Sequence, residues 1–410
     1  MRILLVSNFF PPEGPGGGEM VAHEMAQRLA AAGHEILVVT SPLVNRADEL
    51  PQTDFAIRRT LACNSSSWNP PGADATLRLA IDMQNISALR RAIDAFSPEQ
   101  VLLFNIDGLG ALGIVVFLHE AGFSPAIYLG DNVFHSVCVR PGAREAFFRL
   151  FGAGRALQGL RPIAVSEGLV EEIAGDLGMA LPAPLFVPGW VPDDLPPLAP
   201  APAEKPLRLI FSSRVAEHEG IWILLAAARH LLACEDRDFQ VDFYGAGLVA
   251  EFVQHVHAEG LSGHIRYGGM VAREAMIGTF ARHEALLFPI WQREPLGLVP
   301  FEAAAQGCIP IMTAQAGAAE WLTAADCLKI ERTPMALAGA IQFLLAMPPG
   351  ERAEWRRRIA CHVRHDFGAG RWLGRIERHL HDLPPRRKIM DLQKIQNALF
   401  AITRVGGLEV

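Results

Sequence analysis

The chain has 410 residues, and a length of this order favours two domains over a single core. Half of the residues are hydrophobic and 20% are charged, which is typical of a soluble globular protein and excludes a disordered one. The net charge of -7 argues against a general nucleic-acid binder, so we expect no nucleic-acid partner.

The sequence shows no export or membrane signal. Residues 1–18 carry one basic residue and a short apolar run, which is not the pattern of a signal peptide. The most apolar segment, 101–122, contains Asp107 and several glycines, so a strand, a turn and a helix explain it better than a membrane span. The six cysteines include no CxxC pair and predict free thiols. We therefore expect a cytoplasmic protein.

Apolar runs alternate with helical segments in the first half of the chain. The run 2–9 predicts a buried strand, and 18–33 predicts a helix that ends at Gly33. Further strands are predicted at 35–41, 100–105, 126–131, 161–166 and 184–189.

A Pro/Ala-rich stretch without periodicity follows Pro192 and predicts a linker. Strands alternating with helices favour parallel sheets covered on both faces, and hence two Rossmann-like α/β domains facing across a cleft. Ligands of such sheets bind outside the carboxyl ends of the strands, where each motif below falls. Strands of the second series are predicted at 207–214, 240–245, 264–269, 285–290, 308–313 and 327–330.

The loop after the first strand is rich in glycine, with Gly14, Gly16, Gly17 and Gly18 ahead of a helix. Glycines let backbone N–H groups approach a ligand, and a helix N-terminus favours an anion. The loop therefore predicts a diphosphate or sugar contact. The alternative is a connection that needs positive φ, and the spacing matches neither a Walker loop nor GxGxxG.

The segment GAGLVA at 245–250 fits the pattern GxGxxA, which is typical of a dinucleotide-binding site. That fingerprint also needs an acidic residue at the end of the next strand to hold a ribose. The strand HIRYGG offers none. A tight glycine turn between strand and helix is the favoured interpretation.

Arg214 follows a strand in SSRVAEHEG, residues 212–220, where a guanidinium could clamp a diphosphate bidentately. The alternative is a surface arginine that pairs with Glu217 or Glu219.

The segment EPLGLVPFE at 294–302 lies between an apolar strand and a second apolar run. We expect a turn at Gly297 and a helix from about Leu298, with Glu302 in its first turn. The first N–H groups of such a helix, at Leu298 and Val299, would face an anion. Carboxylates accept hydrogen bonds from paired hydroxyls, so Glu294 and Glu302 could hold a ribose and a sugar ring. The alternatives are a solvated loop residue for Glu294 and helix N-terminus stabilisation for Glu302.

In the first half, YLGDNVFHS places Asp131 and His135 just after a strand, as candidates for acid–base or hydroxyl-binding roles. A structural role is the alternative for His135. No cluster in the sequence has metal-ligand spacing, so we expect no metal and no cofactor.

These motifs give the chain a resemblance to the retaining GT-B glycosyltransferases of family 4, within the glycosyl transferases group 1, over nearly its whole length. The most specific is EPLGLVPFEAAAQGCIPIMT, which looks like the E-x7-E motif of the family. The other carrying segments are 1–19, 162–173, 186–195, 211–220 and 316–322.

The resemblance implies transfer of a sugar from a nucleotide-sugar, which is a substrate, to a sugar, lipid-linked or protein acceptor. It implies retention at the anomeric carbon and no obligatory metal. The implied organisation is an acceptor domain at 1–192, a linker at 193–206, a donor domain at 207–369, a helix at 370–383 that crosses back to the first domain, and a helical tail at 384–410.

The resemblance also implies roles for single residues. Glu302 would bind the donor ribose and Glu294 the sugar hydroxyls, while Arg214 and the helix amides would hold the diphosphate. The expected catalytic residues are Asp131, Arg214 and Glu294, and the acceptor side comprises Asp131 and His135. The expected donor site comprises Gly16, Gly17, Gly18, Arg214, Glu219, Glu294, Gly297, Leu298, Val299 and Glu302.

The chain departs from the family pattern at Glu219, where a lysine is usual, and at Gly130, where His-Asp is often found instead of Gly130-Asp131. Two like charges about 4 Å apart repel by ~4 kcal/mol at an effective dielectric constant near 20. Either Glu219 turns away, or the phosphate is held differently, or activity is lost. His135 is a candidate substitute for the missing histidine. A catalytically inactive homologue that binds nucleotides or glycans as a scaffold is therefore the second hypothesis, and a nicotinamide oxidoreductase resting on GAGLVA is the third.

Two amphipathic segments are candidate contact surfaces. The aromatic and basic segment 143–155 could touch a membrane, at the inner face, or pack on its own domain. The tail places Ile389, Leu392, Ile395, Leu399 and Ile402 at helical spacing. A membrane or partner contact, an oligomer contact and packing on the protein are the alternatives for this tail.

Overall fold

The computed structural model describes residues 1–12, 17–42, 53–63, 80–138, 148–198, 205–290, 295, 297–387 and 391–405. The chain divides into two compact units. Unit 1 comprises Met1–Val187 and Leu373–Val410, and unit 2 comprises Pro188–Trp372. All six cysteines are free, as predicted.

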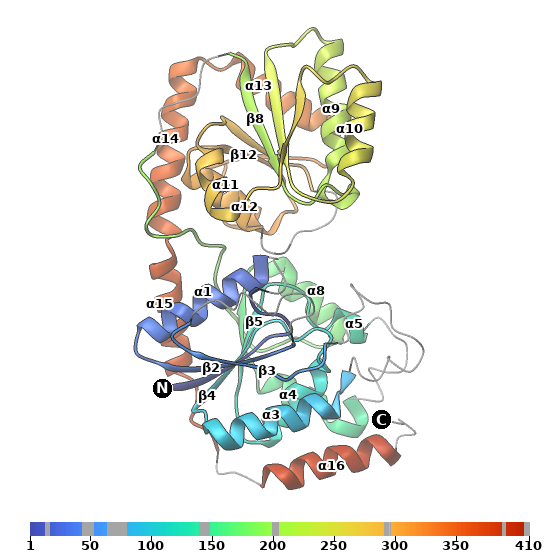
Figure 1. The fold of residues 1–410 in the computed structure, drawn as a ribbon, viewed down its shortest axis with the longest axis vertical. Coiled ribbons are helices and arrows are strands. Elements are labelled where there is room, and N and C mark those ends of the chain that lie inside the picture. Colours follow the sequence, from blue (N-terminus) through green and yellow to red (C-terminus); the bar gives the residue numbers. More distant parts are fainter. Residues whose placement is uncertain are drawn as a thin grey trace. The chain divides into compact units, whose positions relative to one another are not determined.

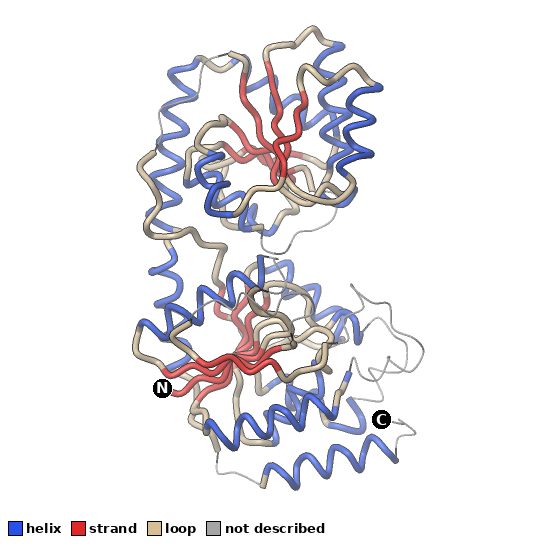
Figure 2. Tube along the Cα trace, viewed as in Figure 1, coloured by secondary structure: helices blue, strands red, loops and turns tan. Residues whose placement is uncertain are grey.

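Unit 1 contains a seven-stranded parallel sheet in the order β3-β2-β1-β4-β5-β6-β7 (Figures 1 and 2). The central strands are apolar and buried, because helices cover both faces. Its strands are β1 (Arg2–Val6), β2 (Glu35–Thr40), β3 (Ala56–Arg59), β4 (Gln100–Leu103), β5 (Ala126–Leu129), β6 (Arg161–Ala164) and β7 (Leu185–Phe186). Its helices before β7 are α1 (Gly17–Ala31), α3 (Met83–Phe96), α4 (Ala111–Glu120), α5 (His135–Cys138), α7 (Ala153–Gln158) and α8 (Glu167–Leu177).

The edge strand β3 is the strand that the sequence did not predict. Its sequence, AIRR, alternates between exposed and half-buried positions and contains no apolar run. An edge strand packs on fewer neighbours, so its hydrophobic signal is weak. The β2 partners fix its register instead, from Leu37 opposite Ala56 to Thr40 opposite Arg59.

Unit 2 repeats the plan with a six-stranded parallel sheet in the order β10-β9-β8-β11-β12-β13. Both sheets confirm the predicted α/β class with two Rossmann-like units. The strands are β8 (Leu207–Ser212), β9 (Phe239–Tyr244), β10 (Ile265–Gly269), β11 (Ala285–Phe288), β12 (Ile309–Thr313) and β13 (Leu328–Ile330). The helices are η1 (Glu217–Glu219), α9 (Ile221–Ala233), α10 (Val249–Ala258), α11 (Arg273–Phe280), α12 (Leu298–Ala305), η2 (Gly317–Glu320), α13 (Pro334–Ala346) and α14 (Pro349–Asp366).

The boundary between the units falls inside α15 (Ala369–His381). At its start, the amide of Gly370 donates to both carboxylate oxygens of Asp193, at 3.1 and 3.0 Å. From Leu373 onward the chain belongs to unit 1.

The tail helix α16 (Leu392–Val405) packs on α3 and α4 of unit 1 (Figure 1). Its residues Leu392, Ile395 and Leu399 are buried there. Ahead of it, Arg386 donates to the carbonyl of Ala121 and covers the Phe123 ring at 4.3 Å. The tail therefore packs on its own domain, which was one of the alternatives predicted from the sequence. Ile389 and residues 143–147 of the other amphipathic segment lie outside the described residues.

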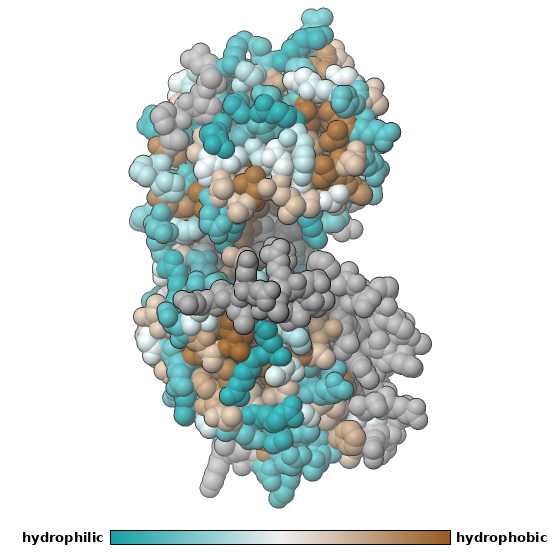
Figure 3. Space-filling model, viewed as in Figure 1, coloured by the Kyte–Doolittle hydropathy of each residue, from teal (hydrophilic) through white to brown (hydrophobic). Residues whose placement is uncertain are grey.

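Among the helices that the structure describes, none combines the length and the apolar character needed to cross a bilayer. Figure 3 shows hydrophobic and hydrophilic side chains interspersed on the viewed face, and one of the hydrophobic groups lies over α9 and α10.

Candidate functional site

The loop after β8 places Arg214 against Glu219. Arg214 donates from Nε to Oε1 of Glu219 at 3.0 Å, and Nη2 lies 3.0 Å from the same oxygen. The hydroxyl of Ser213 donates to Oε2 at 2.7 Å. The Glu219 side chain is 5% exposed, whereas that of Arg214 is 70% exposed. Arg214 thus forms the ion pair with Glu219 that was one of the alternatives predicted from the sequence.

This pair changes the electrostatics expected for the loop. The carboxylate of Glu219 lies in η1, where Arg214 and Ser213 both engage it, so it does not face an incoming anion as an uncompensated charge. The guanidinium has five N–H donors in a planar fork, and most of its surface remains accessible to solvent. Arg214 can therefore still bind an anion, but the pair as a whole carries no net charge.

Two glycines allow this loop to pack closely against neighbouring backbone. A Cβ on Gly245 would lie 1.9 Å from the carbonyl oxygen of Ser213, and one on Gly247 would lie 2.5 Å from that of Val215. Leu248 donates its amide to the Val215 carbonyl at 2.7 Å. GAGLVA is thus a tight turn whose glycines permit close packing against the Arg214 loop, which is the interpretation that the sequence favoured.

The loops after β8 and β11 meet at Gly220. Its φ is +82°, and a Cβ there would lie 1.8 Å from the carbonyl oxygen of Pro289. The strands β8 and β11 are neighbours at the point where the strand order reverses direction. Ligands of open α/β sheets bind at this topological switch point. The candidate residues of unit 2 therefore follow the two strands that flank the expected ligand position.

Helix α12 starts at Leu298, as predicted, with Gly297 as its N-cap at φ 58° and ψ 75°. This left-handed conformation suits glycine, and the cap offers no side-chain hydrogen bond to the first amides of the helix. Phe301 is fully buried and lies against Gly189, where a Cβ would be 2.8 Å from its ring. The Phe301 ring fixes the start of α12 on the body of unit 2.

Glu302 is the fifth residue of α12, and the expectation that it lies in the first helical turn is wrong. Its side chain is 6% exposed, and Arg273, the first residue of α11, donates from Nε to Oε1 at 2.5 Å. A residue beyond the first turn interacts weakly with the helix dipole, so N-terminus stabilisation does not explain Glu302. Arg273 lies 29 positions upstream without any motif around it, and sequence analysis missed it.

In unit 1, His135 begins the short helix α5 and its Nδ1 lies 2.8 Å from Oδ2 of Asp176 on α8. Its side chain is 60% exposed. Asn132 donates to Asp176 at 2.8 Å and to Glu172 at 3.0 Å, which ties α8 to the end of β5. Sequence analysis missed these partners, because they lie 40–44 residues further along the chain.

Asp131 is exposed at the carboxyl end of β5, and its Oδ1 accepts the amide of Asn132 at 2.7 Å. At the end of β4, Asp107 accepts a hydrogen bond from the Ser136 hydroxyl at 2.5 Å. The Asn8 side chain, after β1, donates to the Asp107 carbonyl at 3.2 Å. Hydroxyl and carboxylate groups thus gather at the carboxyl edge of this sheet, where a polar ligand of a parallel sheet binds.

The glycine-rich loop is only partly described. Gly14 and Gly16 lie outside the described residues, as does Glu294. Gly17 is the first residue of α1, and a Cβ on Gly18 would meet no atom within 4 Å.

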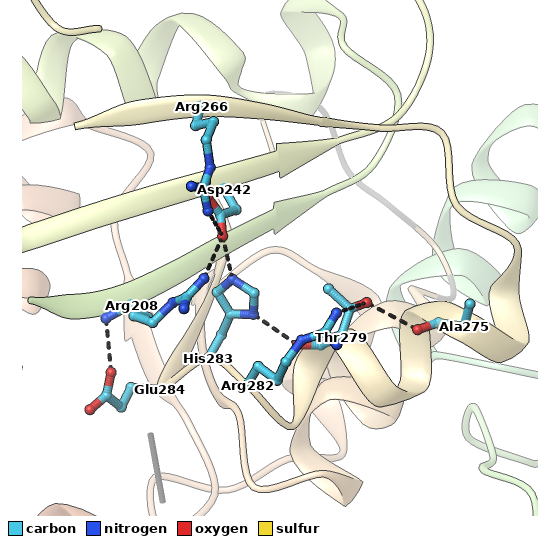
Figure 4. Close-up of polar contacts among 8 residues, drawn as sticks. All are labelled: Arg208, Asp242, Arg266, Ala275, Thr279, Arg282, His283 and Glu284. Carbon is cyan, nitrogen blue, oxygen red and sulfur yellow. Dashed lines mark hydrogen bonds and ion pairs between the residues drawn. The ribbon is translucent and has the colours of Figure 1, made fainter. Parts of the chain in front are cut away.

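A second polar cluster lies within the sheet of unit 2 (Figure 4). Arg208, Arg266 and His283 converge on Asp242, with donor–acceptor distances of 3.0–3.1 Å. Burial would raise the pKa of Asp242, but hydrogen bonds from His283 and Arg208 and the charges of His283 and Arg266 outweigh it and lower the pKa to about 2. Arg208 and His283 lie near the amino ends of β8 and β11, away from the loops above, so the cluster has a structural role.

Residues 199–360 match the family Glycosyl transferases group 1. No curated protein sequence is significantly similar to the chain.

Three solved structures share the fold. Sucrose-phosphate synthase from Thermosynechococcus elongatus is 17% identical, with a TM-score of 0.71 over 93% of this chain and 99% of that one. A glycosyltransferase from Rickettsia africae is 14% identical, with a TM-score of 0.70 over 92% and 97%. HepE from Anabaena in complex with UDP is 15% identical, with a TM-score of 0.69 over 93% and 100%. The family match therefore lies within unit 2, and the solved structures support the GT-B fold for the chain as a whole.

Proposed function

We propose that the chain is a retaining glycosyltransferase that transfers a sugar from a nucleotide-sugar to an acceptor hydroxyl. The match of residues 199–360 to the glycosyl transferases group 1 carries this proposal. The positions of Arg214 and Glu302, after the two strands at the switch point of unit 2, support it. HepE, which shares the fold, has been solved with UDP, and this supports a nucleotide-sugar donor for the present chain.

In the proposed mechanism, the bond between the anomeric carbon and the donor phosphate breaks and the electron pair leaves with the diphosphate. Arg214 and the first amides of α12, at Leu298 and Val299, stabilise this charge. The oxocarbenium-like sugar is attacked by the acceptor oxygen on the same face, and the acceptor proton passes to the departing phosphate. Glu302 binds the donor ribose, and Glu294 binds the hydroxyls of the transferred sugar.

Glu219 has a positioning role in this proposal. Its buried carboxylate engages Nε and Nη2 of Arg214, which restricts the guanidinium before a donor arrives. Such preorganisation lowers the cost of reorganising the group in the transition state. Arg214 offsets the charge of Glu219, so Glu219 does not repel a bound diphosphate. In this proposal, the site can therefore bind an anion without the lysine that is usual in the family.

We propose unit 1 as the acceptor domain, with Asp131 and His135 at the acceptor hydroxyl and the Gly16–Gly18 loop near the donor phosphate. The acceptor is a sugar, a lipid-linked glycan or a protein. The reaction takes place in the cytoplasm and needs no metal.

A donor-hydrolysis and binding screen of the full chain with UDP-, GDP- and ADP-sugars, in the presence of EDTA, tests the proposal. We expect binding and slow hydrolysis of one nucleotide class. NMR of the released sugar should show the anomeric configuration of the donor. An inverted product would contradict retention, and activity that needs an added divalent ion would contradict metal independence. If no nucleotide binds at all, the scaffold hypothesis replaces the enzyme.

A further inference from the structure

We propose that His34, Glu377 and His381 form a binding site for a divalent transition-metal ion of the zinc class. One ligand atom of each residue lies within 4.8 Å of those of the other two. His34 lies in the turn between α1 and β2, and the other two residues lie on α15 within unit 1. Figure 1 shows the start of β2 and the end of α15 on the same flank of unit 1.

The geometry of the three side chains favours convergence on one point. Nε2 of His34 lies 2.9 Å from Oε1 of Glu377, and the rings of His34 and His381 lie 5.5 Å apart. Glu377 and His381 are four residues apart, so they share one face of α15. A tetrahedral ion with bonds of about 2.0–2.1 Å places its ligand atoms about 3.3 Å apart. The longest ligand separation therefore needs to close by about 1.5 Å at most, a change within reach of side-chain rotation.

The chemistry of the donors points to the class of ion. Two imidazoles and one carboxylate suit zinc and its neighbours, whereas calcium and magnesium prefer oxygen ligands alone. The His34 side chain is 6% exposed and that of Glu377 is 33% exposed, while His381 lies at the surface. An ion would thus be half-buried, with solvent access for a water ligand at the remaining position. Nδ1 of His34, the nitrogen left outside the site, lies 3.2 Å from the amino nitrogen of Met1.

Binding of the ion replaces a hydrogen bond with coordination. In the structure, Nε2 of His34 and Oε1 of Glu377 lie 2.9 Å apart, within hydrogen-bond distance. A metal ion needs Nε2 deprotonated, so binding releases a proton to solvent when that nitrogen carries one, and the affinity rises with pH. The ion would join the turn after α1 to the segment of α15 that belongs to unit 1. This site is independent of the proposed sugar transfer.

The sequence spacing could not indicate this site, because His34 and Glu377 are 343 residues apart. Only the return of the chain to unit 1 brings them together.

Isothermal titration of the full chain with Zn²⁺, after EDTA treatment and dialysis, tests the proposal. We expect one equivalent to bind and the melting temperature to rise with free Zn²⁺. The variants His34→Ala, Glu377→Gln and His381→Ala should each weaken binding by at least about 10-fold, since loss of even an outer-shell partner costs 10–100-fold. Circular dichroism and the metal-free melting temperature check that each variant is folded, and Glu377→Gln keeps the size of the side chain if His34→Ala does not fold.

A matched control comes from another close pair of side chains of a type that can bind a metal ion. His230 and Cys234 lie 3.6 Å apart at the end of α9, and the double variant His230→Ala with Cys234→Ser should bind zinc as the unaltered chain does. Co²⁺ should give visible bands of nitrogen and oxygen ligation without a thiolate charge-transfer band. Zero stoichiometry in the unaltered chain, equal affinity in the three variants, or loss of binding in the control would each overturn the proposal.

Discussion

The candidate residues of the two units differ in how they are held. In unit 2, Glu219 and Glu302 are buried, and each is paired with an arginine. In unit 1, Asp131 and His135 are exposed; Asp131 accepts the amide of Asn132, and His135 lies against Asp176. Burial of the two carboxylates favours side chains that are ordered before a ligand binds, because a buried charge must keep its partner. If the proposed function holds, unit 2 is preorganised for the donor and unit 1 leaves more freedom at the acceptor side.

The largest effect should follow Arg214→Ala. Loss of a preorganised donor to a developing anion costs about 10²–10³-fold in kcat, equivalent to ~2.7–4 kcal/mol. Arg229→Ala, a variant of an exposed arginine on α9 of the same unit, is the matched control and should leave kcat unchanged. Steady-state kinetics on the donor found in the screen measures both. If Arg214→Ala retains full kcat, the paired arginine is structural and the donor half is not organised around it.

The next effect should follow Glu302→Gln. A hydrogen bond to a charged group contributes about 1.5–3 kcal/mol, so we expect nucleotide affinity to fall about 10–100-fold. Calorimetric titration with the nucleoside diphosphate measures the change. The control is Glu274→Gln. Glu274 is exposed on α11 beside Arg273, so this variant should bind the nucleotide as the unaltered chain does. Normal affinity in Glu302→Gln would mean that the Arg273–Glu302 pair only fastens α11 to α12.

A substitution of Asp242 tests whether charge pairing stabilises the sheet of unit 2 as well as its loops. Its pKa of about 2 lies below the ordinary value, so its contribution to stability is present above about pH 4 and is lost as the pH falls through 2. The shift corresponds to about 2 kcal/mol. Urea unfolding of Asp242→Asn should show a lower free energy at pH 7 and a smaller loss between pH 4 and pH 2 than the unaltered chain. Equal pH profiles would show that Arg208, Arg266 and His283 do not stabilise this carboxylate.

The smallest effect should follow His135→Ala. An exposed polar contact such as that of His135 with Asp176 contributes about 0–1 kcal/mol, so the acceptor KM should rise by less than about 10-fold. Rates over a range of acceptor concentrations measure it, with Asp176→Asn as the variant that removes the partner alone. A rate loss of 10²–10⁴-fold is typical of removing a general base. Such a loss would make the exposed His135 essential and would contradict the contrast between the two units.

The sequence predicted most strands of both sheets because apolar runs of parallel strands are nearly continuous. The loops at their carboxyl ends followed from the same pattern. The strand β3 was missed, since its residues AIRR lie at an edge with half of their positions exposed. The start of α12 at Leu298 was predicted from Gly297 and Pro300, whose backbone preferences are local.

The partners of the candidate residues were decided by the tertiary structure. Nothing near Glu302 in the sequence points to Arg273, and nothing near His34 points to α15. Even for Arg214 and Glu219, five residues apart, the sequence left open whether they pair. Backbone preferences and hydrophobic periodicity act over a few residues, so the sequence alone determined most of the strands, the glycine turns and the positions of the motifs. Charge pairing depends on which side chains are buried together, so the fold alone decided which carboxylates are neutralised and where imidazoles converge.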